Sequence, residues 1–140
     1  MLSVAKKVKV DYAHALSKYN GKCRNIHGHT STIICYFTGH LKYDTGMIVD
    51  FTILKEILNK TLVDVIDHSL ILNEYEPKSL IEELKNRSEK ILLLPFEPTS
   101  ERLVLYFYDK ISEECKKYNI YLTRIEWHET EGSFAVYEPQ

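Results

Sequence analysis

The chain has 140 residues, 44% of them hydrophobic, and a formal net charge of −2 at pH 7, which predicts one domain over residues 1–140 with a substantial core. The balanced charge argues against a nucleic-acid-binding protein, which normally shows a basic excess, and no apolar run approaches the ~18 residues that span a membrane. Because the N-terminus lacks a signal-peptide pattern and three cysteines at unrelated spacings do not suit a disulfide framework, we expect a cytoplasmic protein.

The first predicted elements are two strands, at about 4–16 and 30–39, along which apolar and polar residues alternate. Residues two apart share a face of a strand. His14 therefore ends one apolar stripe, while His27 and His29 begin the other.

A chain reversal near Asn20-Gly21 would place His14 opposite His27, so three imidazoles would meet at one end of a hairpin. Three neutral histidines with an open fourth position are typical of a catalytic zinc, whereas structural zinc sites have four ligands and are rich in cysteine. The alternative is that each histidine is an ordinary core or surface residue.

Cys23 lies four residues before His27, which on an extended strand would set it ~13 Å away. We therefore expect a wide loop, at about 18–25, that brings the thiol back over the metal. Lys22 and Arg24 flank Cys23, and positive charge favours a thiolate, so the residue is a candidate base or nucleophile. An inert thiol and a fourth zinc ligand are the alternatives.

The later elements alternate between helical and extended patterns. In chain order they are a helix capped by Asp50 that ends near Asp67-His68, a short charged helix at 80–90, an apolar strand or buried segment at 91–94, a helix capped by Thr99 or Ser100 that runs to about 118, and strands at 121–129 and 133–137. The order predicts an α+β domain, a four-stranded antiparallel sheet with two main helices on one face. Such a sheet has two open edges, so we expect it to pair with other copies of itself.

Asp67-His68 is a second candidate for chemistry. The dipole at the end of a helix favours an imidazolium, and an aspartate that fixes a histidine tautomer can support a cysteine in proton transfer. A simple polar helix end is the alternative.

Glu129 extends the apolar stripe of Ile125 and Trp127, although a buried carboxylate needs a partner. Either it binds a ligand with a guanidine-like edge, whose two N–H donors match its two oxygens, or it ends the strand in water. Glu101 stands in the first turn of the second main helix, where it complements the helix dipole.

Taken together, several motifs resemble the 6-pyruvoyl-tetrahydropterin synthase superfamily. They are Cys23-x-x-x-His27-Gly28-His29, Gly46-x-x-x-Asp50-Phe51, Asp67-His68, Pro98-Thr99-Ser100-Glu101 and Glu129-Thr130. The retained cysteine and its three-residue spacing from His27 are most similar to the bacterial and archaeal branch, the 6-carboxytetrahydropterin synthases of the queuosine (7-deazaguanine) pathway.

The resemblance implies a zinc-dependent lyase of the tunnelling fold, in which sheets assemble into an oligomeric barrel, a tetramer or hexamer with active sites at subunit interfaces. It would convert 7,8-dihydroneopterin triphosphate to 6-carboxy-5,6,7,8-tetrahydropterin, releasing acetaldehyde and triphosphate. The implied roles are Zn²⁺ ligation by His14, His27 and His29, proton abstraction by Cys23, a relay by Asp67 and His68, anchoring of the pterin 2-amino-4-oxo edge by Glu129, and a substrate contact by Glu101.

Other functions stay open at this point. One is 6-pyruvoyl-tetrahydropterin synthase activity on the same substrate. A different class is a thiol hydrolase that uses Cys23, His68 and Asp67, and a third is a non-catalytic assembly subunit stabilised by zinc.

Overall fold

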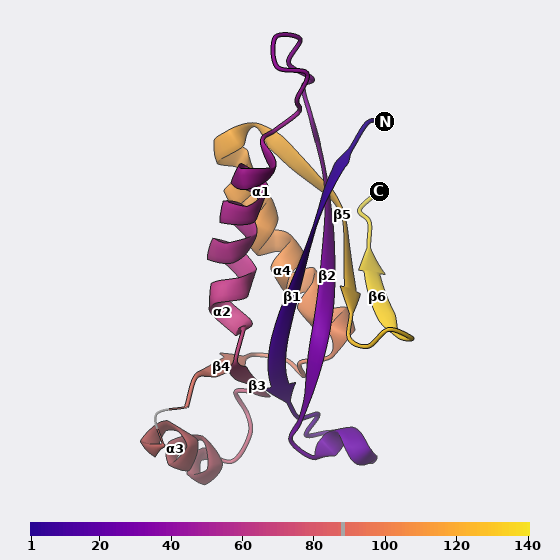
Figure 1. Cartoon of the computed structure of the whole chain (residues 1–140). Coiled ribbons are helices and arrows are strands. Elements are labelled where there is room, and N and C mark those ends of the chain that lie inside the picture. Colours follow the sequence, from indigo (N-terminus) through magenta and orange to yellow (C-terminus); the bar gives the residue numbers. More distant parts are fainter. Residues whose placement is uncertain (88) are drawn as a thin grey trace.

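The computed structural model describes residues 1–87 and 89–140. Its strands form one six-stranded sheet in the order β4-β3-β1-β2-β5-β6 (Figure 1). The elements are β1 (Val4–His14), η1 (Lys22–Arg24), β2 (His27–Gly39), α1 (Phe51–Leu58), η2 (Asn59–Val63), α2 (Asp64–Ile66), β3 (Ser69–Asn73), α3 (Lys78–Asn86), β4 (Ile91–Leu94), α4 (Ser100–Cys115), η3 (Lys116–Tyr118), β5 (Ile120–His128) and β6 (Phe134–Tyr137).

The long hairpin of β1 and β2 has the predicted register. Val4 pairs with Phe37 at one end, and His14 pairs with His27 at the other. The predicted faces are also confirmed, because residues such as Val10 and Ile33 are buried while their sequence neighbours are more exposed. The connection between the strands is the wide loop that Cys23 required, and it contains the short 3₁₀ turn η1.

The prediction of a four-stranded, fully antiparallel sheet is wrong. β3 and β4 extend the sheet beyond β1, and both new pairings are parallel. β4 was expected as a strand or a buried segment, but β3 was not expected at all. β3 is five residues long and almost wholly buried, so it shows none of the alternation that identifies a half-exposed strand.

The first main helix begins where it was predicted, since the Asp50 carboxylate accepts a hydrogen bond from the Thr52 backbone N–H at 2.9 Å. It continues from α1 through a π turn, η2, into α2. The side chains of Leu54, Leu58, Leu62 and Ile66 are completely buried against the sheet. Phe51, the first residue of the helix, is 58% exposed.

The second main helix, α4, begins at the Thr99 cap, whose hydroxyl accepts a hydrogen bond from the Arg102 N–H at 3.2 Å. It packs across β5 and β6, and the ring of Phe107 stacks on Trp127 with the ring centroids 5.5 Å apart. Figure 1 shows α1, α2 and α4 together on one face of the sheet, as predicted.

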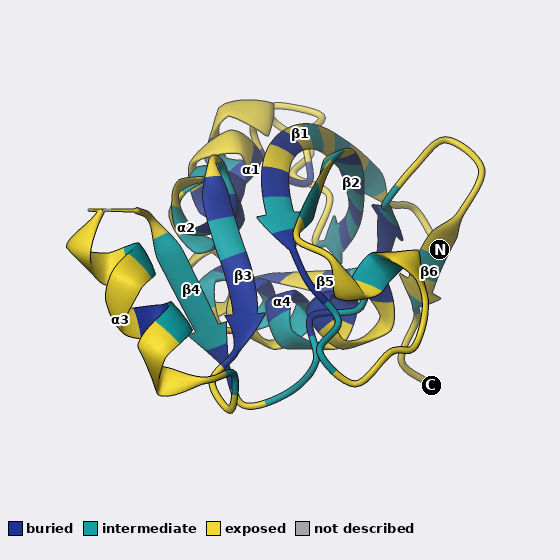
Figure 2. Ribbon diagram, turned by 90° about the horizontal axis from the view of Figure 1, so that it is seen from below, coloured by how far each residue is buried: buried dark blue, intermediate teal, exposed yellow. Residues whose placement is uncertain are grey.

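The short charged helix expected at 80–90 is present as α3, which begins two residues earlier and ends at Asn86, and residue 88 of the expected range lies outside the described residues. Figure 2 shows α3 beside β4 at the margin of the fold, with most of its surface exposed. Among the described residues, no helix has the length and apolar character to cross a membrane.

Candidate metal centre and active site

Three histidines converge where the β1–β2 hairpin opens into its loop. His14 is the last residue of β1, and His27 and His29 are the first and third residues of β2. The ring centroids are 4.7 Å apart for His14 and His27, 5.1 Å for His14 and His29, and 4.9 Å for His27 and His29. One ring nitrogen from each residue lies within 4.8 Å of the other two.

Backbone carbonyls orient two of these rings. His14 Nδ1 donates to the Pro98 carbonyl at 2.8 Å, and His27 Nδ1 donates to the Asn25 carbonyl at 2.6 Å. This arrangement leaves the Nε2 atoms for a ligand, and a partner on the second ring nitrogen is the usual support of a metal-bound histidine. Burial also holds the pKa of His14 below its usual value, which favours the neutral imidazole that a metal needs.

The three Nε2 atoms are buried and have no hydrogen-bond partner among the described residues. Unsatisfied buried polar atoms are costly, so three of them in one place suit the binding of a cation. Three neutral imidazoles fit Zn²⁺, which binds histidine nitrogen and commonly keeps a fourth position open at catalytic sites. The group could hold a metal ion.

Glu129 follows β5 directly and faces the same point. Its Oε1 atom lies 3.4 Å from Nε2 of His14 and 3.4 Å from Nε2 of His29, and neither contact is aligned as a hydrogen bond. The side chain is 27% exposed. The carboxylate therefore borders the candidate metal centre and is partly accessible to solvent.

Tyr12 supports the centre in a way that the sequence pattern did not reveal. Its hydroxyl accepts hydrogen bonds from Trp127 Nε1 and from Ser31 Oγ, both at 3.1 Å. Its ring packs on those of His14 and His29. Burial raises the pKa of Tyr12. In the sequence, Tyr12 stands out only as a member of the apolar stripe, between Val10 and His14, and this position predicts ordinary packing.

Cys23 lies in η1 and is half-buried, and its carbonyl accepts a hydrogen bond from the Leu16 N–H at 2.9 Å. The other two cysteines, Cys35 and Cys115, are packing residues. Both are buried, and burial raises the pKa of Cys35 and raises that of Cys115 to about 12. Cys23 is thus the one cysteine with access to solvent.

Asp67 and His68 form a pair, with Asp67 Oδ2 3.0 Å from His68 Nδ1. The other carboxylate oxygen accepts a hydrogen bond from the Asp11 N–H at 2.9 Å, and this bond is the main reason why the pKa of Asp67 lies below its usual value. His68 itself donates its backbone N–H to the Asp11 carbonyl at 2.6 Å, and its side chain is 77% exposed.

Among the described residues, no hydrogen bond or ion pair joins Asp67 or His68 to the three histidines. The backbone of His68 lies beside Asp11, which is three residues before His14 on β1. A hollow of about 590 Å³ borders both His29 and His68, and Lys90 lies on its rim. Glu101 is exposed in the first turn of α4.

Residues 3–140 match the family model described as 6-pyruvoyl tetrahydropterin synthase. The chain belongs to this family. It is 31% identical over 144 residues to the 6-carboxy-5,6,7,8-tetrahydropterin synthase of Haemophilus influenzae, with 99% of each chain covered. It is 32% identical over 120 residues to the 6-pyruvoyl tetrahydrobiopterin synthase of Dictyostelium discoideum, with 86% of this chain and 76% of that protein covered.

The fold is that of the 6-pyruvoyl tetrahydropterin synthase family as well. The synthase of Caenorhabditis elegans superposes with a TM-score of 0.73 at 20% identity, covering 99% of this chain and 96% of that one. Membership of the family confirms the resemblance inferred from the motifs and the expectation of an enzyme of the lyase class.

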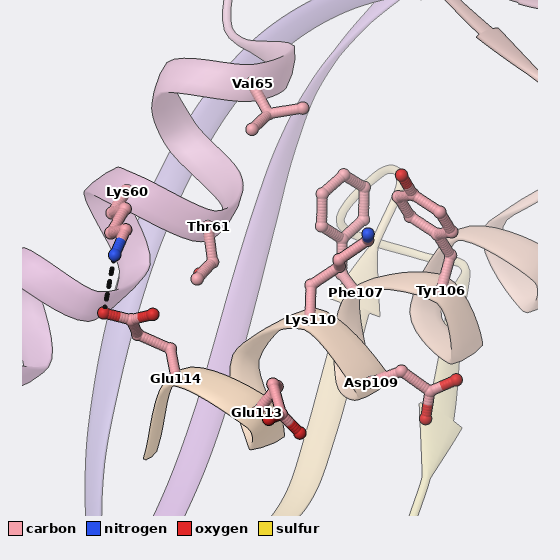
Figure 3. Close-up of a pocket in the computed structure, with 9 residues that line it drawn as sticks. All are labelled: Lys60, Thr61, Val65, Tyr106, Phe107, Asp109, Lys110, Glu113 and Glu114. Carbon is pink, nitrogen blue, oxygen red and sulfur yellow. Dashed lines mark hydrogen bonds and ion pairs between the residues drawn. The ribbon is translucent and has the colours of Figure 1, made fainter. Parts of the chain in front are cut away.

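A larger hollow lies elsewhere, between η2 and α4, with a volume of about 640 Å³ (Figure 3). Val65 and Phe107 form its apolar side, and Lys60 contacts Glu114 across one end at 3.0 Å. None of the predicted site residues lines it. The chemistry of the histidines, rather than the size of a hollow, therefore identifies the candidate site of this family member.

Proposed function

We propose that the protein is a zinc-dependent 6-carboxytetrahydropterin synthase. It would take 7,8-dihydroneopterin triphosphate and water to 6-carboxy-5,6,7,8-tetrahydropterin, acetaldehyde and triphosphate, in the cytoplasm and as a step of 7-deazaguanine (queuosine) synthesis. The observation that carries the proposal is the set of three buried, unpartnered Nε2 atoms beside the Glu129 carboxylate. The full-length match to the Haemophilus influenzae synthase supports the carboxy product.

His14, His27 and His29 would hold the zinc ion. Bound there, zinc supplies Lewis-acid polarisation of oxygens on the side chain of the substrate. The carbonyls of Pro98 and Asn25 keep two of the rings in the tautomer that presents Nε2.

Glu129 would anchor the pterin. A carboxylate accepts two parallel hydrogen bonds from an amino group and a ring N–H, the pattern of the 2-amino-4-oxo edge. Because Glu129 stands against His14 and His29, a pterin bound there would have its side chain close to the metal centre. Glu101 remains a candidate for a further substrate contact.

Cys23 would remove the proton from the carbon beside the polarised oxygen, and its thiol would then carry that proton. His68, oriented by Asp67, would return a proton elsewhere on the side chain, which divides base and acid work between two groups. Lys22 and Arg24 beside the thiol are candidates for contacts with the triphosphate.

Because His68 is 77% exposed and, among the described residues, makes no hydrogen bond or ion pair with the three histidines, we propose that it serves the site of a neighbouring copy in a homo-oligomer. In the described part of the chain, β4 and β6 each pair on one side only, so both sheet edges are free to join other copies. A barrel-shaped tetramer or hexamer would use these edges.

The Dictyostelium discoideum relative favours one alternative, 6-pyruvoyl-tetrahydropterin synthase activity on the same substrate. A Cys23-His68-Asp67 hydrolase within one chain has less support, because no hydrogen bond joins Cys23 to His68 among the described residues. A non-catalytic zinc-stabilised subunit would need no accessible thiol or exposed relay.

The test is to incubate zinc-loaded protein with 7,8-dihydroneopterin triphosphate and to identify the products by mass. We expect 6-carboxytetrahydropterin with one acetaldehyde and one triphosphate per turnover, and loss of the reaction after chelation. The His40→Ala variant is the control, since His40 is an exposed histidine outside the centre. A pyruvoyl product would favour the alternative synthase, and an unchanged substrate would contradict both.

A further inference from the structure

Two consecutive residues before α4, Glu97 and Pro98, contact both parts of the candidate site. The Pro98 carbonyl accepts the hydrogen bond from His14 Nδ1 described above. The Glu97 carboxylate contacts the loop that carries Cys23. One short segment, about 80 positions away in the chain, thus borders a metal ligand and the segment with the candidate base.

The Glu97 carboxylate accepts three hydrogen bonds from two neighbouring residues. Oε1 accepts from Ser17 Oγ at 2.6 Å and from the Lys18 N–H at 2.8 Å, and Oε2 accepts from the Ser17 N–H at 3.3 Å. Two of the donors are backbone groups, so the carboxylate fixes the backbone at Ser17 and Lys18 as well as the Ser17 side chain. Hydrogen bonds to an ionised acceptor are the stronger class.

The backbone segment that Glu97 holds is connected to Cys23 by a hydrogen bond. Leu16, directly before Ser17, donates its N–H to the Cys23 carbonyl at 2.9 Å, and its own carbonyl accepts from the Tyr19 N–H at 3.1 Å. Glu97 therefore holds the residues that in turn bond the backbone of Cys23. The loop from residue 17 to residue 25 is largely polar and exposed.

We infer that Glu97 is a positioning residue that holds the Cys23 loop at the metal centre. It does not touch the reacting atoms in this arrangement, and its effect passes through Ser17, Leu16 and the Cys23 backbone. The catalytic consequence rests on the proposed function, but the position of the loop does not. Pro98 keeps its own bond to His14, so the two neighbouring residues have separable roles.

The test compares Glu97→Ala, Glu97→Gln and Ser17→Ala with the control Glu74→Ala, which removes an exposed carboxylate from the loop after β3. The first measurement is the alkylation rate of Cys23 by iodoacetamide in metal-free protein, read by peptide mass. A released loop exposes the half-buried thiol, so we expect Glu97→Ala to react at least about threefold faster, following the larger population of open states.

The second measurement is the zinc affinity by competition with a chelator, and the third is the split between kcat and KM. We expect Glu97→Ala to keep the zinc affinity, because Pro98 still orients His14. Its kcat should fall by up to ~100-fold at a nearly unchanged KM, the size of effect that a misplacement of about 1 Å can cause. Glu97→Gln and Ser17→Ala, which keep some of the three hydrogen bonds, should lie between wild type and Glu97→Ala.

Each outcome decides the inference. An alkylation rate and kcat equal to those of Glu74→Ala would overturn it, and so would a parallel loss of zinc affinity, since Glu97 would then act on the metal ligands. If Glu97→Ala does not fold, the alkylation rates of the other two variants carry the same decision. If wild-type protein leaves dihydroneopterin triphosphate unchanged while the alkylation rates respond as expected, the proposed function fails and the positioning role stands.

Discussion

His14 Nδ1 lies 2.8 Å from the carbonyl oxygen of Pro98, so the end of β1 is joined to the segment that leads into α4. The bond determines which nitrogen of a fully buried imidazole faces its two neighbouring histidines. A histidine ring without such a partner could rotate or change tautomer, and its Nε2 atom would then no longer be held toward the other two histidines.

We expect His29→Ala to abolish stable metal binding, because two imidazoles cannot complete a site built for three. His29 is 17% exposed, so its truncation should disturb packing less than truncation of His14, which is 1% exposed. The measurement is the zinc content after dialysis against a weak chelator. His40→Ala should retain its metal, and an equal content in both variants would contradict the assignment.

The proposed sharing of sites between copies predicts complementation. Cys23→Ser and His68→Ala should each lose turnover by about 10²-fold or more, since each removes one proton-transfer group. When the two are co-expressed with different tags and purified as mixed oligomers, about a quarter of the sites would combine an intact Cys23 with an intact His68 from another copy. Recovered turnover is the expected result, and mixed oligomers as inactive as the parents would place the relay within one chain.

Glu126 predicts a specific loss of stability in acid. Burial acts to raise the pKa of Glu126, but hydrogen bonds from His128 Nε2 at 2.9 Å and Arg124 Nη2 at 2.8 Å outweigh it and hold the pKa below the usual 4.5. A carboxyl whose pKa is lower in the folded state stabilises the fold above its unfolded pKa, and this contribution is lost as the pH falls through the folded value.

The Glu126→Gln variant should therefore be less stable than wild type from pH 5 to 8, by about 1–3 kcal/mol for a buried, charge-assisted network. The difference should shrink below about pH 4.5. Urea unfolding at pH 7 and pH 3.5 measures it. Glu138→Gln removes a 61% exposed partner of Arg124 and should change little, whereas a difference for Glu126→Gln that does not depend on pH would contradict this explanation.

Thr99→Ala should lower the free energy of unfolding by ~1 kcal/mol, because it leaves the first turn of α4 without its side-chain cap. Thr99→Ser keeps a hydroxyl in the same place and is the matched control. Thermal and urea unfolding provide the comparison. Equal losses in both variants would show that the methyl group, rather than the hydrogen bond, is what stabilises the helix start.

The parts of the fold that could be predicted depend on local signals. The alternation along β1 and β2 and the cap residues Asp50 and Thr99 are visible over a few positions of sequence. β3 could not be found in this way, because a short buried strand in a parallel pairing lacks alternation and depends on partners distant in the chain.

The candidate site shows the same difference between features with a local sequence signal and features that depend on distant residues. The convergence of the histidines follows from strand parity and register, both of which the pattern contains. The contacts of Tyr12 with Trp127 and of Glu97 with Ser17 join segments about 80 or more residues apart, and no local pattern reports them. The motif Asp67-His68 was recognisable, but its position beside Asp11 depends on how β3 docks beside β1.

His68 has a backbone φ of 60°, in the left-handed region where a side chain costs about 1 kcal/mol relative to glycine. Glycine at this position would relieve that strain and would also delete the imidazole. Stability and the proposed proton transfer thus make opposite demands on one residue. Selection of this protein for heat resistance alone would favour glycine at position 68, at the expense of the imidazole that the proposed function needs.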